Sequence, residues 1–208
     1  MNGRYENGAL PEKVRLLYEA VLAMVTDGWD INRMKVSDIT AQAGIGKGTA
    51  YEYFSSKEEI IANAVLYDVE MRLAHVLEIT KGEGDFAGKF VQILTYMEEM
   101  FAKRQAFCLL VRIGTGSYEV SESMRRECEK RQQALGCHLA DRIVESLMCQ
   151  GVSEGTIGET NPYLQKLAFV AQMTAFAGYL VDLDIFRICR ERKGDDLFIA
   201  FLFLHLSK

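Results

Sequence analysis

Apolar residues recur at steps of three and four along most of this chain, and this spacing limits the possible folds more than any other feature of the sequence. The first such stretch contains Val14, Leu17, Val21 and Met24 behind Pro11. It predicts an amphipathic helix over residues 11–27 that ends at Gly28. Only two prolines occur in 208 residues, and the alternation typical of strands is never sustained. We therefore predict an all-α fold.

The same spacing, combined with turn residues, predicts the other helices. Their expected ranges are 36–43, 47–55, 56–80, 85–104, 121–150 and 162–183, with a last helix after Gly194. Side chains that cap a helix are expected at three helix starts, namely Ser56, Asp85 and Asn161. Residues 151–161 are polar and rich in glycine, and they predict a loop.

Charge and cysteine content narrow the possible partners and the compartment. The formal net charge is −5, which gives no global argument for nucleic-acid binding. Any DNA-binding surface must therefore be local. The five cysteines lack the spacing of a disulfide framework, and the first residues carry no apolar segment of the secretory type. We expect a cytoplasmic protein with reduced thiols.

Two short helices separated by a glycine-containing turn are predicted between residues 36 and 55. Gly44 supplies the left-handed residue that such a turn needs, and Gly46 stands at the N-cap position of the second helix. The side chains expected to hold the two helices together are Ile39, Ala43, Ile45 and Phe54. This is the layout of a helix-turn-helix motif, whose second helix lies in the major groove of DNA.

The segment from Val36 to Ile60 resembles the TetR family of bacterial transcriptional regulators. It reads VSDITAQAGIGKGTAYEYFSSKEEI, and the likeness lies in the turn glycine, the Lys-Gly-Thr opening of the second helix, its Tyr-x-Tyr-Phe end and the following Ser-Lys-Glu-Glu cap. The resemblance implies a DNA-binding domain over residues 1–60 and an effector-binding and dimerisation domain over residues 61–208.

The resemblance also implies which side chains contact DNA. The expected contacts are Lys47, Gly48, Thr49, Tyr51, Tyr53 and Lys57. A lysine can meet a phosphate or a guanine edge, and glycine permits a close approach to the duplex. The structural alternative is that the Lys-Gly-Thr triplet is a plain helix start and that the tyrosines are a half-buried pair.

Two positions depart from the family pattern. Lys35 stands where many relatives have a capping threonine; it lacks a cap oxygen but offers charge to a phosphate, and Ser37 and Thr40 are nearby hydroxyl candidates. Glu52 lies in the recognition helix, where phosphate repels it unless it accepts a hydrogen bond from cytosine or points away. Residues 33–57 hold four basic and two acidic side chains. We therefore expect two copies to read a palindrome together, because each supplies little charge alone.

The helix expected over residues 162–183 is apolar nearly all round, so it needs cover on two faces. One stripe of it consists of the small residues Ala168, Ala171, Ala175 and Gly178. The apolar C-terminal helix adds Phe198, Phe201 and Leu202. We predict a homodimer interface from these residues, as the resemblance also implies, with burial inside a monomer as the alternative. The apolar stretch is shorter than the ~20 residues of a membrane span, so no membrane partner is predicted.

Flexible and aromatic side chains in the middle of the chain are candidates to line an apolar cavity for a small-molecule effector. They are Phe90, Tyr96, Met97, Met100, Phe107, Cys108, Met124, Met148, Met173 and Phe176. The resemblance implies an inducer that changes the separation of the two recognition helices. Plain core packing is the alternative for most of these side chains. A constitutive or partner-controlled regulator without a ligand is the alternative function.

The sequence gives less support for a nucleotide-binding loop, a metal site or a catalytic site. The sequence GIGKGT at residues 44–49 lacks the first glycine and the Ser or Thr of a phosphate loop, and no strand precedes it. Cys128, Cys137 and His138 lack the paired short spacing of a metal site, and no histidine belongs to a catalytic motif. We predict no metal, no cofactor and no enzyme activity, with a helical enzyme as a remote alternative. The expected role is that of a repressor released from a palindromic DNA operator by a small apolar or amphipathic effector.

Overall fold

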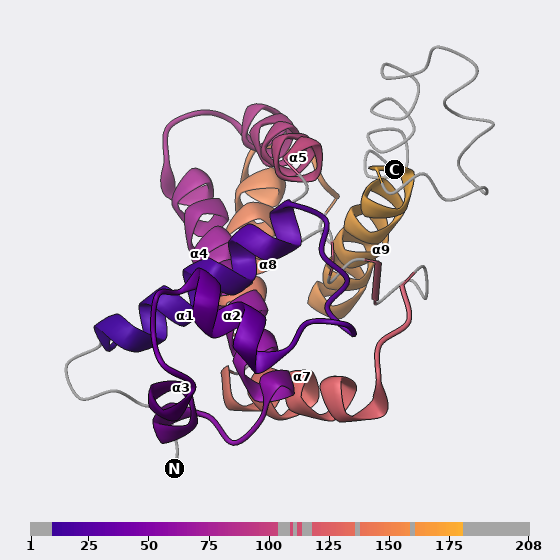
Figure 1. Ribbon diagram of the computed structural model, residues 1–208. Coiled ribbons are helices and arrows are strands. Elements are labelled where there is room, and N and C mark those ends of the chain that lie inside the picture. Colours follow the sequence, from indigo (N-terminus) through magenta and orange to yellow (C-terminus); the bar gives the residue numbers. More distant parts are fainter. Residues whose placement is uncertain are drawn as a thin grey trace. The chain divides into compact units, whose positions relative to one another are not determined.

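The computed structural model describes residues 10–103, 109, 112–113, 118–135, 138–158 and 161–180. These residues form helices and no strand, which confirms the all-α prediction (Figure 1). The helices are α1 (Glu12–Thr26), α2 (Val36–Gln42), α3 (Lys47–Tyr53), α4 (Lys57–Lys81), α5 (Phe86–Ala102), α7 (Glu122–Leu135), α8 (His138–Ser153) and α9 (Pro162–Leu180). The last helix expected from sequence, after Gly194, lies outside the described residues.

The predicted capping side chains occur at the starts of α4, α5 and α9. The Ser56 hydroxyl accepts the backbone N–H of Glu59 at 3.1 Å. The Asp85 carboxylate accepts the N–H of Gly88 at 2.8 Å, and the Asn161 side chain accepts that of Tyr163 at 2.8 Å. Each bond satisfies a backbone donor that the helix itself leaves unpaired. The three capping predictions are confirmed.

The single helix predicted over residues 121–150 is wrong. In the structure α7 ends at Leu135 and α8 begins at His138. The apolar spacing does not reveal the break because each of the two helices is amphipathic by itself.

The loop predicted from residue 151 begins later than expected, because α8 continues to Ser153. Gly155 follows in the left-handed region with φ 72°, which glycine adopts without steric cost. The N–H of Gly155 donates to the Val152 carbonyl at 3.0 Å and that of Thr156 donates to the Gly151 carbonyl at 2.9 Å. The helix therefore ends in a glycine-dependent turn.

Packing divides the chain into two compact units. Unit 1 consists of Met1–Glu70 and Lys103–Gly136, and unit 2 consists of Met71–Ala102 and Cys137–Lys208. The helix α4 contributes residues to both units. The domain boundary predicted at residue 60 stays a prediction. Unit 1 contains α7 in addition to the predicted helix-turn-helix.

The core of unit 1 forms where α1 packs against α2 and α3. Its fully buried side chains include Val14, Leu17, Val21, Met34, Ile39, Ile60 and Ile61. Burying one such aliphatic side chain contributes roughly 1.5–3 kcal/mol. Phe54 packs against Tyr18 of α1 with ring centroids 6.0 Å apart, which confirms its predicted structural role.

Unit 2 contains a second core where α5, α8 and α9 meet. Phe90 of α5 lies between Phe86 and Phe169, with ring centroids 5.9 and 6.1 Å away. Lys89 is buried, and its ammonium donates to the Thr80 carbonyl at 2.9 Å and to Gln150 Oε1 at 2.8 Å. This lysine therefore satisfies a carbonyl in the last turn of α4 that the helix cannot pair itself.

Candidate nucleic-acid interface

The turn between α2 and α3 depends on Gly44, which has φ 66°. The N–H of Gly44 donates to the Ala41 carbonyl at 3.2 Å, and the N–H of Ile45 donates to the Thr40 carbonyl at 3.0 Å. These two bonds form a Schellman motif, in which glycine takes the left-handed position. The predicted role of Gly44 is confirmed. Its consequence is a sharp, fixed connection between the two short helices.

The first turn of α2 is capped in a way that the sequence only partly indicates. Lys35 is the N-cap residue and makes no capping bond with its side chain, because an ammonium has no acceptor. The Asp38 carboxylate instead accepts the backbone N–H of Lys35 at 3.0 Å. The lysine side chain is exposed and stays available for an anion.

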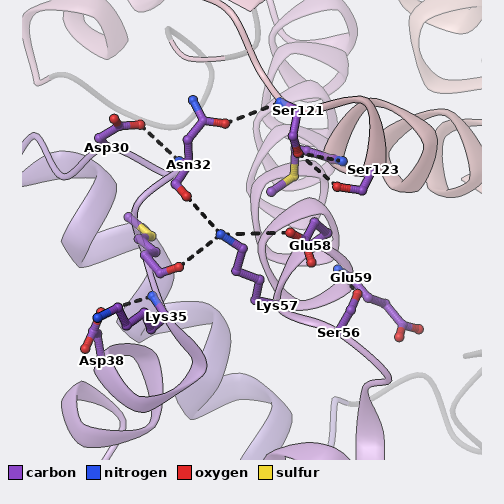
Figure 2. A network of polar contacts seen from close by, with 12 residues as sticks. Asp30, Asn32, Lys35, Asp38, Ser56, Lys57, Glu58, Glu59, Ser121 and Ser123 are labelled. Atoms are coloured by element: carbon purple, nitrogen blue, oxygen red, sulfur yellow. Dashed lines mark hydrogen bonds and ion pairs between the residues drawn. The ribbon is translucent and has the colours of Figure 1, made fainter.

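At the start of α4, Lys57 is held by the loop that precedes α2 (Figure 2). Its ammonium donates to the backbone carbonyls of Asn32 at 2.9 Å and Met34 at 3.2 Å. The Glu58 carboxylate is 3.9 Å away. The two carbonyls take two of the three donors of the ammonium. These bonds hold the Lys57 ammonium against the loop that precedes α2.

Five of the predicted DNA-contacting residues line one open pocket of about 420 Å³. The lining residues are Met34, Lys35, Val36, Ser37, Lys47, Tyr51 and Lys57. We call this hollow the lysine pocket. Three ammonium-bearing side chains and two hydroxyls line it, and no acidic residue does. Such a lining suits a phosphate, which accepts hydrogen bonds and carries negative charge.

Of the predicted contacts on α3, Lys47 and Tyr51 line this pocket, whereas Gly48, Thr49 and Tyr53 do not. Tyr51 is 55% exposed and Tyr53 is 40% exposed, which is high for aromatic side chains. A Cβ built on Gly48 would meet no neighbouring atom within 4 Å, so the fold does not require a glycine there. Thr49 is half-buried and Glu52 is exposed.

Thr40 differs from the other predicted DNA contacts. It is 3% exposed, and its hydroxyl donates to the Ser37 carbonyl at 3.3 Å within α2. A buried hydroxyl with an internal acceptor is unsuited to contact a phosphate outside the protein. The sequence groups it with the surface hydroxyls because a single sequence does not distinguish the inner face of so short a helix.

The residues predicted for an effector pocket are divided between the two units. Unit 2 holds Phe90, Tyr96, Met97, Met100, Met148, Met173 and Phe176. Most of these are buried and Met173 is half-buried. The half-buried Tyr96 packs against His75 with ring centroids 4.7 Å apart and the rings tilted by 51°. Phe107 and Cys108 lie outside the described residues.

Met124 belongs to the other unit. It is 2% exposed and lies in the hydrophobic core of unit 1. Residue type and a place in the middle of the chain group it with the others, and neither shows which unit a side chain packs into. In the structure Met124 belongs to α7 and Met148 to α8, in different units.

The predicted dimer stripe is only partly exposed. On α9, Ala171 is exposed, Ala168 and Ala175 are half-buried, and Gly178 is buried. Larger apolar side chains on the same helix are more exposed, namely Tyr163, Leu164, Leu167 and Val170. Phe198, Phe201 and Leu202 lie outside the described residues.

Within the part of the chain that the structure describes, no three side chains of the metal-binding types are grouped so that they could hold an ion. The described helices include none with the length and hydropathy of a membrane span.

A polar network around Asn32 was not predicted from sequence. Asn32 Nδ2 donates to the Glu119 carbonyl at 2.9 Å, and the Tyr118 hydroxyl donates to Asp30 Oδ1 at 2.6 Å. The N–H of Asn32 also donates to Asp30 Oδ1 at 3.0 Å, a local pattern that a sequence can suggest. The partners near residue 119 are almost ninety positions away in the sequence, so no local motif reveals them.

Comparison with known proteins agrees with this geometry. Residues 30–64 match the family model described as bacterial regulatory proteins, tetR family. A comparison with curated protein sequences finds no significant match. The matched segment contains the Asn32 loop, α2, α3 and the start of α4.

Solved structures of similar fold extend over nearly the whole chain. FadR from Bacillus subtilis, in complex with stearoyl-CoA, is 16% identical with a TM-score of 0.62, covering 93% of this chain and 97% of that one. Reduced NemR from E. coli is 17% identical with a TM-score of 0.65, covering 95% and 96%. The SmeT–triclosan complex is 17% identical with a TM-score of 0.63, covering 95% and 93%. Residues 30–64 are thus similar to the tetR family of bacterial regulatory proteins, and the fold of the chain is similar to those of FadR and NemR.

Proposed function

We propose that this chain is a transcriptional repressor that binds a palindromic operator as a homodimer and is released by a small apolar or amphipathic effector. It acts in the cytoplasm through binding and not through catalysis. The observation that carries the proposal is the lysine pocket beside the exposed face of α3. Cationic side chains there meet phosphates, while the neighbouring helix reaches base edges.

The proposal assigns different roles to the two sides of this surface. Lys35, Ser37 and Lys57 contact the DNA backbone, because they line the pocket at the starts of α2 and α4. On α3, Lys47, Thr49, Tyr51 and Tyr53 contact phosphates or base edges. Gly48 permits the backbone of α3 to approach the duplex. Thr40 is left out of this set because it is buried.

The charge balance of the chain supports sequence-specific binding to DNA and not a general, nonspecific affinity for it. A net charge of −5 opposes nonspecific binding, while the lysine pocket concentrates three positive charges in one place. Each subunit offers few such contacts, so two subunits on successive half-sites give the needed affinity.

Selection of bound duplexes from a random DNA pool tests the proposal. We expect a palindromic site, and we expect Lys47→Ala and Tyr53→Ala to weaken binding to it. Lys47→Ala should also make the salt dependence of binding shallower by about 1 for each phosphate that the lysine no longer neutralises. Lys81→Ala is the matched control, because Lys81 is an exposed lysine paired with Glu78 outside unit 1. Recovery of no enriched sequence at low salt would refute the proposal.

The effector part of the proposal rests on the buried aromatic and methionine side chains of unit 2. Two proteins of similar fold form complexes with stearoyl-CoA and with triclosan, which makes these compounds the first probes. We expect an effective probe to release the selected operator and to raise the melting temperature of the free protein. A reporter gene behind the operator then distinguishes repression from activation. A panel of apolar compounds that never alters operator binding favours a constitutive or partner-controlled regulator.

A further inference from the structure

The side chain of Asn32, in the loop between α1 and α2, forms hydrogen bonds with two backbone groups that lie just before α7 in the sequence. Its Nδ2 donates to the Glu119 carbonyl at 2.9 Å. Its Oδ1 accepts the N–H of Ser121 at 3.3 Å, a bond that Figure 2 shows. A side-chain amide presents both a donor and an acceptor, so it satisfies both backbone groups at once. We call these two bonds the Asn32 clamp.

The same residue also holds the lysine pocket. The backbone carbonyl of Asn32 accepts from the Lys57 ammonium at 2.9 Å, and the Met34 carbonyl two residues later accepts at 3.2 Å. Hydrogen bonds from a charged donor are stronger than those between neutral groups. They therefore set the direction of the lysine side chain, which has many rotamers when free. Asn32 thus touches the start of α7 with its side chain and the pocket with its backbone.

A second link joins the same loop to the same segment. The Tyr118 hydroxyl donates to Asp30 Oδ1 at 2.6 Å, and Asp30 Oδ1 also accepts the N–H of Asn32 at 3.0 Å. Beyond the clamp, the Ser121 hydroxyl accepts the N–H of Met124 at 3.3 Å, and Met124 is buried in the unit 1 core. Residues 118–124 are therefore fastened to the loop and to the core within one unit.

The helix α7 connects the segment held by the clamp to unit 2 along the chain. The second segment of unit 1 ends at Gly136, and the chain continues into unit 2 at Cys137. The segment held by the clamp is thus covalently followed by α7 and then by α8 of unit 2. The clamp joins residues 119 and 121, which precede α7, to the loop that holds Lys57.

We propose that Asn32 is a positioning residue that links the start of α7 to the Lys57 ammonium, so that displacement of residues 119–121 weakens DNA binding. This inference rests on the proposed function and adds a route for its regulation. It predicts that loss of the clamp and loss of the Lys57 charge act on the same step of DNA binding.

A double-mutant cycle on the selected operator tests the link. We expect Asn32→Ala and Lys57→Met each to weaken binding roughly tenfold per subunit at about 0.1 M salt, the size expected when one phosphate is no longer neutralised. Each should make the salt dependence shallower by about 1 per subunit. Because both changes remove the same interaction, the double variant should bind no more weakly than Lys57→Met alone.

Asn63→Ala is the matched control, since Asn63 Nδ2 also donates to a backbone carbonyl of unit 1, that of Glu59 at 2.8 Å. It should leave the salt dependence unchanged. Asn32→Asp provides a second variant if Asn32→Ala unfolds, because it keeps the acceptor for Ser121 and loses the donor to Glu119. Additive losses in the double variant, or an Asn32→Asp protein that folds with wild-type salt dependence, would overturn the link. If wild-type protein selects no DNA site, the proposed function itself fails.

Discussion

Tyr118 and Asp30 change each other's acidity through a single hydrogen bond of 2.6 Å. Burial, followed by this bond and the negative charge of Asp30, raises the pKa of Tyr118 to about 12. In the other direction, the Tyr118 hydroxyl and then the N–H of Asn32 hold the pKa of Asp30 below its ordinary value. The pair is therefore strongest while the phenol keeps its proton and the carboxylate has lost its own.

The stability contributed by Tyr118 should depend on pH in the alkaline range. Its folded pKa of about 12 lies above the ordinary value of 10.0, so the folded state keeps the proton longer than the unfolded state. The stabilisation is fully present below pH 10 and is lost as the pH rises from 10 toward 12. Urea unfolding gives the free energy of unfolding of wild type and of Tyr118→Phe. Over this pH range the value for wild type should fall relative to that of the variant, so that the gap between the two values changes. A gap that is constant with pH would contradict the assignment.

Lys89 is the buried charge on which the end of α4 depends. Its ammonium is the donor to the Thr80 carbonyl and to Gln150 Oε1, and Lys89→Met keeps the aliphatic stem while leaving both acceptors without that donor. A buried polar group left unsatisfied costs about 1–3 kcal/mol, so we expect a loss of roughly 2 kcal/mol or more in the free energy of unfolding. Urea denaturation measures this loss.

Lys81→Met is the matched control for Lys89. Lys81 also lies at the end of α4, but its ion pair with Glu78 is exposed. Exposed pairs contribute about 0–1 kcal/mol, so this variant should unfold almost as wild type does. Equal losses in the two variants would mean that burial of the ammonium has no special role.

Two glycines in helices differ in whether packing within the chain requires them. A Cβ on Gly151 of α8 would lie 2.6 Å from Ile157 Cδ1 and 3.0 Å from Phe86 Cδ2, so these side chains would have to move. A Cβ on Gly48 of α3 would meet nothing within 4 Å. The first glycine is explained by packing within the chain, whereas the second is not.

Substitution of each glycine by alanine should therefore act on different quantities. We expect Gly151→Ala to lower the free energy of unfolding by about 1–3 kcal/mol through overpacking, despite the better helix propensity of alanine. Gly48→Ala should raise stability by up to ~1 kcal/mol, because it removes a poor helix former. It should weaken operator binding by at least about tenfold, which is ~1.4 kcal/mol. Thermal unfolding and fluorescence anisotropy on the selected duplex measure the two effects, and unchanged binding by Gly48→Ala would remove its proposed role.

The helices themselves were largely predictable from sequence. Periodic apolar spacing with capping side chains predicts α1, α4, α5 and α9, because burial of one face and satisfaction of the first N–H groups are both local demands. The break between α7 and α8 was missed, because an amphipathic pattern continues through Gly136. The inner position of Thr40 was missed as well, since seven residues give too little periodicity to define a face.

The candidate site was predictable only where its residues belong to one local motif. Lys47, Tyr51 and Lys57 lie within eleven consecutive positions, and the fold of this stretch brings them to one pocket. The Asn32 clamp joins residues that are 87 and 89 positions apart. Such a pairing depends on how α7 packs against the core of unit 1, and one sequence carries no signal of that packing.

At the scale of the whole molecule, the described residues include several large apolar side chains that are exposed on α9. Leu164, Leu167 and Val170 are 52%, 53% and 47% exposed on this one helix. Exposed apolar side chains clustered on one element are typical of association surfaces. The proposed homodimer uses this helix, because two subunits must be joined to read two half-sites.

A charge placed on α9 tests the dimer and its role in DNA binding together. Ala171 is exposed and belongs to the predicted interface, so Ala171→Glu should place a carboxylate in an apolar interface without disturbing the unit 2 core. We expect sedimentation equilibrium to show a dimer for wild type and a monomer for the variant. Because the two half-sites are then bound independently, affinity for the full operator should fall on the order of 10²-fold, while affinity for a single half-site stays the same. Val91→Glu is the matched control, since Val91 is also apolar and exposed but lies on α5. A variant that remains dimeric would remove α9 from the interface, and a monomeric wild type with full operator affinity would remove the dimer from the mechanism.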